Sequence, residues 1–402
     1  MAAGRLEGMS SSPGASQGLW TRDFVLNLLT GHFTFVCYTA LFTIIPPYVL
    51  DLGGEEWHIG VVIGSFGVVG LVIRPFAGRW VSVFGATRIA VLGAAILGVA
   101  SLLHILAPSV WWLVPVRMLQ GVGLAMGPVA TTTMVANLAP AARRAEGMAI
   151  MGNSIAIASL YSPVLSFWLM GRFGFPASFL FSGATGLLAA AIATGISSAR
   201  TRVPDMAAAT TRVPLISRGA LFPTAVFLSY TLTTAPVNTF LPLLAEDRGL
   251  GNPGLFFSVF SFTTMAVMLW SGMVADRLGR SAVIIPGLLM AALSMVLLSV
   301  ASNQAVFLTA ALLSGTGFGL LQPGMQSWVV DRVPPRERAS GVATLQAAWD
   351  IGGSGGAFIL GPVAAALSVA STFGIVAASA VVGAAGFALG GRRTPAPTLP
   401  QK

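Results

Sequence analysis

Charged residues are scarce in this chain. They make up 9% of its 402 residues, whereas 55% of the residues are hydrophobic. Soluble domains carry about 25% charged residues, so most of this surface must face lipid. Cysteine occurs once, at Cys37, which excludes a disulfide framework and a thiolate metal site. Lysine also occurs once, at Lys402, and this excludes a P-loop and an ATP-driven motor of that type.

Long apolar runs dominate what is present. A run of about 20 apolar residues can cross a bilayer, and in lipid it must be helical to satisfy its own backbone hydrogen bonds. Glycine, proline and charged residues divide the sequence into twelve such runs. Their predicted bounds are 23–49, 58–83, 88–107, 110–137, 144–170, 176–197, 219–245, 254–274, 281–301, 304–330, 337–368 and 371–391. We therefore predict an all-α membrane protein with twelve transmembrane helices.

The longest break between apolar runs predicts the division into domains. We expect a six-helix bundle over 21–197, a cytoplasmic linker over 198–218 and a second six-helix bundle over 219–392. The Gly- and Ser-rich residues 1–20 predict a disordered cytoplasmic N-terminus without a cleavable signal peptide, and residues 393–402 a cytoplasmic tail.

Positive charge is concentrated on one side of this topology. Of the 22 lysines and arginines, only Arg172 and Arg248 fall in loops of the opposite side, and only Arg74 and Arg117 fall within spans. Cytoplasmic loops carry the positive excess, so both termini are expected in the cytoplasm and the chain in the cell membrane. This topology explains the net charge of +9 better than nucleic-acid binding does. Arg74 is expected to reach toward water at the cytoplasmic end of its span.

A glycine turn occurs twice in the chain. Gly78, Ser82 and Gly85 recur as Gly272, Asp276 and Gly279, each 194 residues later (272 − 78). Gly121, Gly123, Pro140, Arg144 and Gly147 recur at the same shift as Gly315, Gly317, Pro334, Arg338 and Gly341. Such a register indicates two parallel six-helix repeats. Repeats of this kind predict a substrate site near the midplane between two pseudo-symmetric bundles.

These motifs resemble those of the major facilitator superfamily, and in particular its 12-helix drug/proton antiporter branch. The loop motif of that family, Gly-x-x-x-Asp-Arg-x-Gly-Arg, is similar to Gly78, Ser82, Gly85 and Arg88, and more closely to Gly272, Asp276, Gly279 and Arg280. The resemblance implies that both turns act as gating loops, although Ser82 replaces the usual aspartate. Arg117-Met-Leu-Gln120-Gly-Val-Gly-Leu-Ala resembles the antiporter motif of the fourth helix. The antiporter motif of the fifth helix, Gly-Pro-x-x-Gly-Gly, is only partly present, since Pro163 is kept but the glycines are replaced.

Two charges deep in spans are the main functional candidates. Arg117 is expected about 10 Å below the surface at roughly 1.5 Å per residue, too deep to reach water easily. Asp350 is the only carboxylate that we place near the bilayer centre, where burial disfavours its charge and makes it a candidate for exchanging protons. A purely structural Asp350, paired with Arg117 or hydrogen-bonded to Gln322 or Gln326, is the alternative.

Further polar side chains on the spans are candidates to line the substrate cavity or to hold helices together. They are His32, Asn27, Gln120, Asn153, Tyr230, Asn238, Gln322, Gln326, Gln346 and Trp349. His32 could also titrate. Ser354, in a Gly-x-Ser-x-Gly pattern, is not expected to be a hydrolase nucleophile, because that chemistry needs a strand-turn-helix and a partner base. No metal, cofactor or catalytic residue is predicted.

The sequence thus favours a secondary active transporter, not an enzyme, working as a monomer by alternating access. The resemblance implies proton-coupled efflux of a small organic molecule such as a drug, a siderophore or another metallophore, or a metabolite. Asp350 would carry the proton, and Arg117 would tune it or bind an anionic group. An uptake symporter on the same fold is the alternative, and a non-transporting membrane receptor or scaffold is a remote one.

Overall fold

The computed structural model describes residues 19–140, 143–197, 216–334 and 337–391. The predictions of a disordered N-terminus, a linker and a cytoplasmic tail fall largely or wholly outside these residues. The described chain is almost entirely helical and contains no strand. Eleven of its helices are long and apolar enough to cross a membrane. The prediction of an all-α membrane fold is confirmed.

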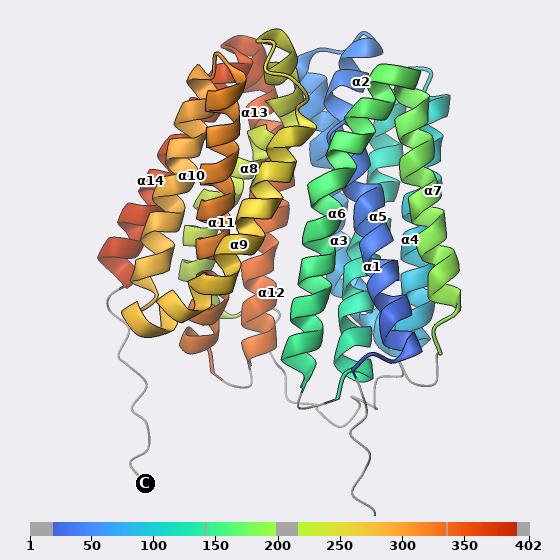
Figure 1. Ribbon diagram of the computed structural model, residues 1–402, viewed down its shortest axis with the longest axis vertical. Coiled ribbons are helices and arrows are strands. Elements are labelled where there is room, and N and C mark those ends of the chain that lie inside the picture. The colour runs from blue at the N-terminus through green and yellow to red at the C-terminus, as the bar shows by residue number, and fades with distance from the viewer. Residues whose placement is uncertain (1–18, 141–142, 198–215, 335–336, 392–402) are drawn as a thin grey trace, which may run out of the picture.

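The helices form two side-by-side groups (Figure 1). The first contains α1 (Arg22–Phe42), α2 (Ile45–Asp51), α3 (Glu56–Phe84), α4 (Ala86–Leu103), α5 (Val110–Leu138), α6 (Arg144–Phe173) and α7 (Phe175–Thr194). The second contains α8 (Leu221–Asp247), α9 (Gly254–Leu278), α10 (Ser281–Val300), α11 (Gln304–Arg332), α12 (Arg338–Ala348), η6 (Trp349–Ser354), α13 (Gly355–Ala366) and α14 (Val369–Gly390). We call the end near residues 197 and 216 the linker end, and the end that holds α2 the far end.

The span predicted over 337–368 is not one regular helix. It consists of α12, the π-helical turn η6 and α13. Single π-turns inside α-helices occur frequently at functional sites. The glycines of this region allow close packing: a Cβ at Gly352 would collide with Thr231, and one at Gly356 would lie 2.9 Å from the Cβ of Ala235. η6 and α13 are therefore held tightly against α8.

The repeat is visible in the three-dimensional contacts. Helices α5 and α11 begin and end 194 residues apart (304 − 110 and 332 − 138). A Cβ at Gly121 would lie 2.6 Å from the carbonyl oxygen of Phe66, and one at Gly315 would collide with the carbonyl of Phe260, at the same shift. The two halves are thus built on one packing scheme, as the sequence predicted.

The halves meet along two seams related by the same shift. In the first seam α3 packs against η6 and α13, and in the second α6 packs against α9. A Cβ at Gly60 would lie 2.5 Å from the carbonyl oxygen of Ala357, and one at Gly254 would lie 2.8 Å from the carbonyl carbon of Pro163. The hydroxyl of Ser258 in α9 donates to the carbonyl of Leu160 in α6, 2.5 Å away.

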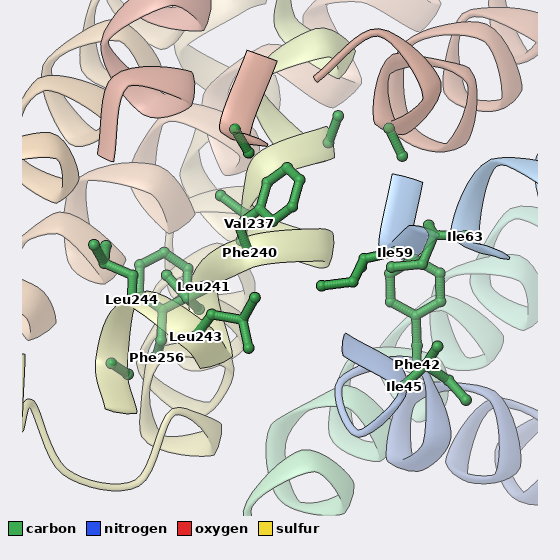
Figure 2. Packing of buried hydrophobic residues seen from close by; sticks show 14 of the residues in the cluster. Phe42, Ile45, Ile59, Ile63, Val237, Phe240, Leu241, Leu243, Leu244 and Phe256 are labelled. Carbon is green, nitrogen blue, oxygen red and sulfur yellow. The ribbon is translucent and has the colours of Figure 1, made fainter. Parts of the chain in front are cut away.

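The far end is closed by an apolar core shared between the halves. Phe42, Ile45, Ile59 and Ile63 of the first half belong to one buried cluster with Val237, Phe240, Leu243 and Leu244 of the second (Figure 2). Burying large apolar side chains contributes about 1.5–3 kcal/mol each, so this packing favours a closed far end. The ribbons of the two halves diverge toward the linker end, at the bottom of the view (Figure 1).

Candidate functional site

An ion pair joins the halves across the first seam. Nη2 of Arg74 in α3 lies 3.0 Å from Oδ1 of Asp350 in η6, and the two side chains are 42% and 8% exposed. The other carboxylate oxygen, Oδ2, is buried and has no hydrogen-bond partner among the described residues. The site therefore holds a nearly buried acid whose single counter-ion comes from the opposite half.

The pair lies next to the tightly packed part of the seam. Going toward the linker end along α3, Gly60 faces Ala357, Gly67 faces Ser354 and Gly70 faces Asp350. A Cβ at Gly67 would collide with the Cβ of Ser354, whereas one at Gly70 would lie 3.6 Å from Oδ1 of Asp350. The packing between α3 and η6 is therefore too tight for a Cβ at Gly67 but leaves room for one at Gly70, beside the ion pair.

The second seam lacks this pair. The repeat places Met268 of α9 at the position of Arg74 and Ala156 of α6 at that of Asp350, each at the shift of 194 (268 − 74 and 350 − 156). The same helix pairing therefore forms with apolar residues in one half of the pseudo-symmetric interface. Since the architecture does not require charge at this place, the ion pair calls for another explanation.

The partner of Asp350 differs from the structural alternative considered above. Arg117 and the two glutamines were candidates, but the carboxylate pairs with Arg74. Arg74 was expected to reach toward water, and its side chain is partly exposed, but its guanidinium also crosses the seam to pair with Asp350. A sequence signal did exist: a deep acid needs a cation, and Arg74 and Arg117 were the two within spans.

An aromatic cluster surrounds Trp349, the residue before Asp350. Its ring meets those of Phe227, Tyr230 and Phe318 edge to face, with centroids 5.7, 6.2 and 5.6 Å away. The rings of Tyr230 and Phe318 stack at 5.8 Å, and Phe318 stacks on Phe260 at the same distance. Such arrangements stabilise each ring pair by about 0.5–1.5 kcal/mol. They fix the orientation of the indole of Trp349.

Unpartnered acceptors lie on the same elements. Oε1 of Gln322 and Oε1 of Gln346 are buried without a hydrogen-bond partner among the described residues, as is the hydroxyl of Tyr230. Gln346 stands one helical turn before Asp350, and Gln322 one turn after Phe318. Buried polar atoms without partners are unfavourable by about 1–3 kcal/mol each. Each of these atoms could accept a hydrogen bond from a donor group of a ligand or from water.

Arg117 lies inside the first half and does not contact Asp350 in the described structure. Its Nη1 donates to Oε1 of Gln120 at 2.7 Å, and Nε2 of Gln120 donates to the hydroxyl of Ser101 at 3.0 Å. The guanidinium lies over the rings of Phe42 and Phe66, 5.2 and 4.8 Å from their centroids. The side chain is 1% exposed, and Nε and Nη2 have no partner among the described residues.

The environment of Arg117 differs from the one expected. It neither faces water nor contacts a carboxylate in the described structure, so direct tuning of Asp350 by contact is not seen. The equivalent position in the second half is Ala311, which is fully buried. The fold therefore accommodates an apolar residue at this position, and the arginine is retained against an electrostatic penalty.

His32 forms a second polar group in the first half. Its Nδ1 donates to the carbonyl of Ser154 at 2.9 Å, which leaves Nε2 of a neutral ring to accept from the hydroxyl of Tyr161 at 3.0 Å. His32 and Tyr161 are partly buried, and Asn153 beside Ser154 is exposed. This group belongs to α1 and α6 and is separate from the ion pair.

The remaining predicted residues have different surroundings. Asn27 is buried, and its Nδ2 donates to the carbonyl of Thr131 at 3.0 Å, which fits a helix-packing role. Asn238 and Gln326 are half-buried on α8 and α11. No cluster of three or more potential metal ligands occurs among the described residues.

The two glycine turns have equivalent backbones. Gly85 and Gly279 follow α3 and α9 with φ of 89° and 87°, a conformation that L side chains rarely adopt. Gly78 and Gly272 lie on these helices with open space around them, and Arg88 is exposed on α4. Nε of Arg280 lies 3.4 Å from Oδ2 of Asp331. The side chains of Ser82 and Asp276 lie outside the described structure, so their gating roles stay predictions.

Ser354 shows why its motif is not catalytic. It ends the π-turn η6 within a helical span, and its Cβ faces Gly67 of α3. No strand precedes it in the described chain. The pattern arises from the density of small residues in a packed seam.

The fold and the intramembrane charges define the class: a multi-pass helical membrane transporter built from two repeats. The family model of the Major Facilitator Superfamily matches residues 27–256 and 222–402. The chain therefore belongs to the Major Facilitator Superfamily, whose members are transporters and not enzymes.

Curated relatives include proteins named for drug resistance. Multidrug resistance protein 2 of Bacillus subtilis is 27% identical over 169 residues, which are 42% of each chain. Quinolone resistance protein NorA of Staphylococcus aureus is 28% identical over 124 residues, 30% of this chain and 31% of NorA. An uncharacterised MFS-type transporter of Methanocaldococcus jannaschii is 22% identical over 83% of this chain and 89% of its own length. The alignments to the two resistance proteins thus span less than half of those proteins.

Solved structures show the same fold at low identity. The nucleoside transporter NupG superposes with a TM-score of 0.71 and 14% identity, covering 92% of this chain and 99% of that one. A POT family transporter superposes with a TM-score of 0.77 and 12% identity, covering 92% and 96%. The human organic anion transporter MFSD10 has a TM-score of 0.66 and 15% identity, covering 91% and 98%.

Proposed function

We propose that this chain is a secondary active transporter that exports a small organic molecule in exchange for protons. The observation that carries the proposal is Asp350, a nearly buried acid at the seam between the two halves. Its pair with Arg74 is absent from the equivalent position of the second seam. The relatives named for multidrug and quinolone resistance support an organic cargo and the outward direction.

The proposed orientation places the linker end in the cytoplasm. The turns at Gly85 and Gly279 then face the cytoplasm together with most arginines, which agrees with the positive-inside rule. The closed far end would face the outside, so the described conformation would be inward-facing. In alternating access the apolar contacts of the far end separate while the linker end closes.

In the proposed cycle Asp350 is the coupling group. Its carboxylate is protonated, paired with Arg74 or engaged by cargo, and protonation removes the negative charge that the other two states need. Antiport requires that cargo and proton compete for the carrier. The carboxylate of Asp350 would satisfy this requirement, because both the proton and the cargo would bind to it.

The test is proton movement by the purified full chain in proteoliposomes. In inverted orientation, an inside-acid gradient should drive accumulation of a transported compound from a panel of drugs, metallophores and metabolites. The same compound should release protons from vesicles with the wild-type chain and not from vesicles with Asp350→Asn. If no compound in the panel moves protons, the antiport proposal fails.

Uptake by symport is the second candidate, and Arg74 is the observation that favours it. Its side chain is 42% exposed, so an acidic cargo group could replace Asp350 at the guanidinium. The displaced carboxylate would then bind a proton more readily, and cargo and proton would move in the same direction. The sign of the proton flux on cargo addition distinguishes the two functions.

A further inference from the structure

The guanidinium of Arg74 occupies a site that the second half supplies. The carboxylate of Asp350, the indole of Trp349 and the amide of Gln346 belong to η6 and α12, whereas Arg74 comes from α3 of the other half. The guanidinium is a flat cation with five N–H donors. It is bound to one oxygen of Asp350, and the second oxygen has no partner among the described residues.

Three unpartnered buried atoms of the second half share one chemistry. Oδ2 of Asp350, Oε1 of Gln346 and Oε1 of Gln322 are all hydrogen-bond acceptors. Three acceptors without donors, one of them charged, are complementary to a cation that carries several N–H groups. The aromatic cluster at Trp349, the residue before Asp350, supplies flat, apolar ring surfaces in the same half. Aromatic faces also attract cations.

The repeat indicates that Arg74 is not needed to hold the seam together. Met268 stands at the equivalent position of the second seam, and the helices pack in the same manner. The partial exposure of the Arg74 side chain also means that it can leave Asp350 for water, whereas the acid cannot. The mobile partner of the pair is therefore the arginine.

We propose that Arg74 is a tethered competitor for the cargo site: in the empty transporter its guanidinium takes the place at Asp350 that a cationic group of the cargo takes during transport. The cargo class is then a flat aromatic amidine or guanidine, with its N–H donors on Asp350, Gln346 and Gln322 and its ring against Trp349. This inference rests on the proposed function, and it adds the cargo chemistry and a role for Arg74.

The test uses three probes of nearly one shape and different charge: benzamidine, benzamide and benzoate. Their binding is measured by calorimetry on the purified full chain, for the wild type, Arg74→Ala and Arg74→Gln. Removing the competitor should strengthen benzamidine binding at least about tenfold, since hydrogen bonds to charged groups contribute about 1.5–3 kcal/mol. Benzamide binding should change little, and benzoate binding should not improve.

Two variants provide the controls. Arg79→Ala removes an arginine from the same helix α3 outside the pair and should leave benzamidine binding at the wild-type level. Asp350→Asn should abolish the gain when combined with Arg74→Ala. Circular dichroism and gel filtration establish that each variant is folded, and Arg74→Gln keeps most of the side-chain volume if the alanine variant is unstable.

The outcomes separate this inference from the proposed function. Unchanged or weaker benzamidine binding in both Arg74 variants overturns the tethered competitor. Loss of benzoate binding together with weaker benzamidine binding assigns Arg74 to an acidic cargo group instead. In either case wild-type proteoliposomes can still exchange a panel compound for protons, and a failure of that exchange bears on the proposed function alone.

Discussion

The close approach of Gly60 to the second half makes the closed far end testable. A Cβ at this position would lie 2.5 Å from the carbonyl oxygen of Ala357 and 3.0 Å from the Cα of Gly361. Both neighbours are backbone atoms, so the overlap cannot be relieved by a side-chain rotation. Overpacking of this kind is unfavourable by about 1–3 kcal/mol. Gly60→Ala should therefore disfavour the described conformation relative to one with the far end open, by about 5- to 150-fold.

Gly121→Ala is the matched control for this substitution. Its Cβ would lie 2.6 Å from the carbonyl oxygen of Phe66, a similar overlap, but α5 and α3 belong to the same half. If the halves move as rigid bodies, that contact is the same in every state of the cycle. Gly121→Ala should thus lower the unfolding temperature without changing the balance between states.

The assay is a spin-label distance across the far end. Asp51 and Asp247 are exposed and belong to opposite halves at the far end. Cys37 is the only cysteine, so a Cys37→Ala background leaves the two introduced labels alone. Gly60→Ala should add a longer distance to the distribution, and Gly121→Ala should not. A distribution unchanged by Gly60→Ala would refute the view that this seam opens during transport.

Four further substitutions test the other assignments. Asp276→Ala should impair transport more than Ser82→Ala, and equal effects in uptake assays would show that both turns are only tight corners. Arg117→Met should leave the unfolding temperature unchanged or raise it, because it removes a buried charge without a carboxylate partner, while transport falls; a large drop in unfolding temperature would indicate a structural arginine. Ser354→Ala should retain full transport, since alanine keeps the Cβ that faces Gly67, and a loss would point to a role for the hydroxyl.

The sequence was sufficient for the architecture because membrane physics restricts it. Span length, helix formation and the repeat each follow from local rules, and the shift of 194 between Gly121 and Gly315 reappears as the same backbone contact in both halves. The bounds of α5 and α11 keep that shift at both ends. Span length and helix formation depend on residues close together in one helix. The repeat depends only on a constant spacing along the sequence.

The pairing at the site could not be predicted by the same rules. The rise per residue gives the depth of Asp350 and Arg117 in the membrane, but depth does not determine which way each side chain points or which half it meets. Arg74 and Asp350 come from different halves, so their contact depends on how the halves dock. The π-turn adds a second obstacle, because the regular α-helical spacing that a sequence pattern assumes does not hold over Trp349–Ser354.

Comparing the two halves identifies charged residues that the fold does not need, because apolar residues stand at the equivalent positions of the other half. Arg117 corresponds to buried Ala311, Arg74 to Met268 and Asp350 to Ala156, yet the helices around these positions pack alike. A charge within the membrane is unfavourable by several kcal/mol unless it is paired or hydrated. Of the three, Arg117 is buried without a carboxylate partner among the described residues, and Asp350 is paired with a cation whose side chain is partly exposed. In the empty transporter these charges lack some of the interactions that would stabilise them. A carrier requires this, because cargo or a proton must supply the missing interactions.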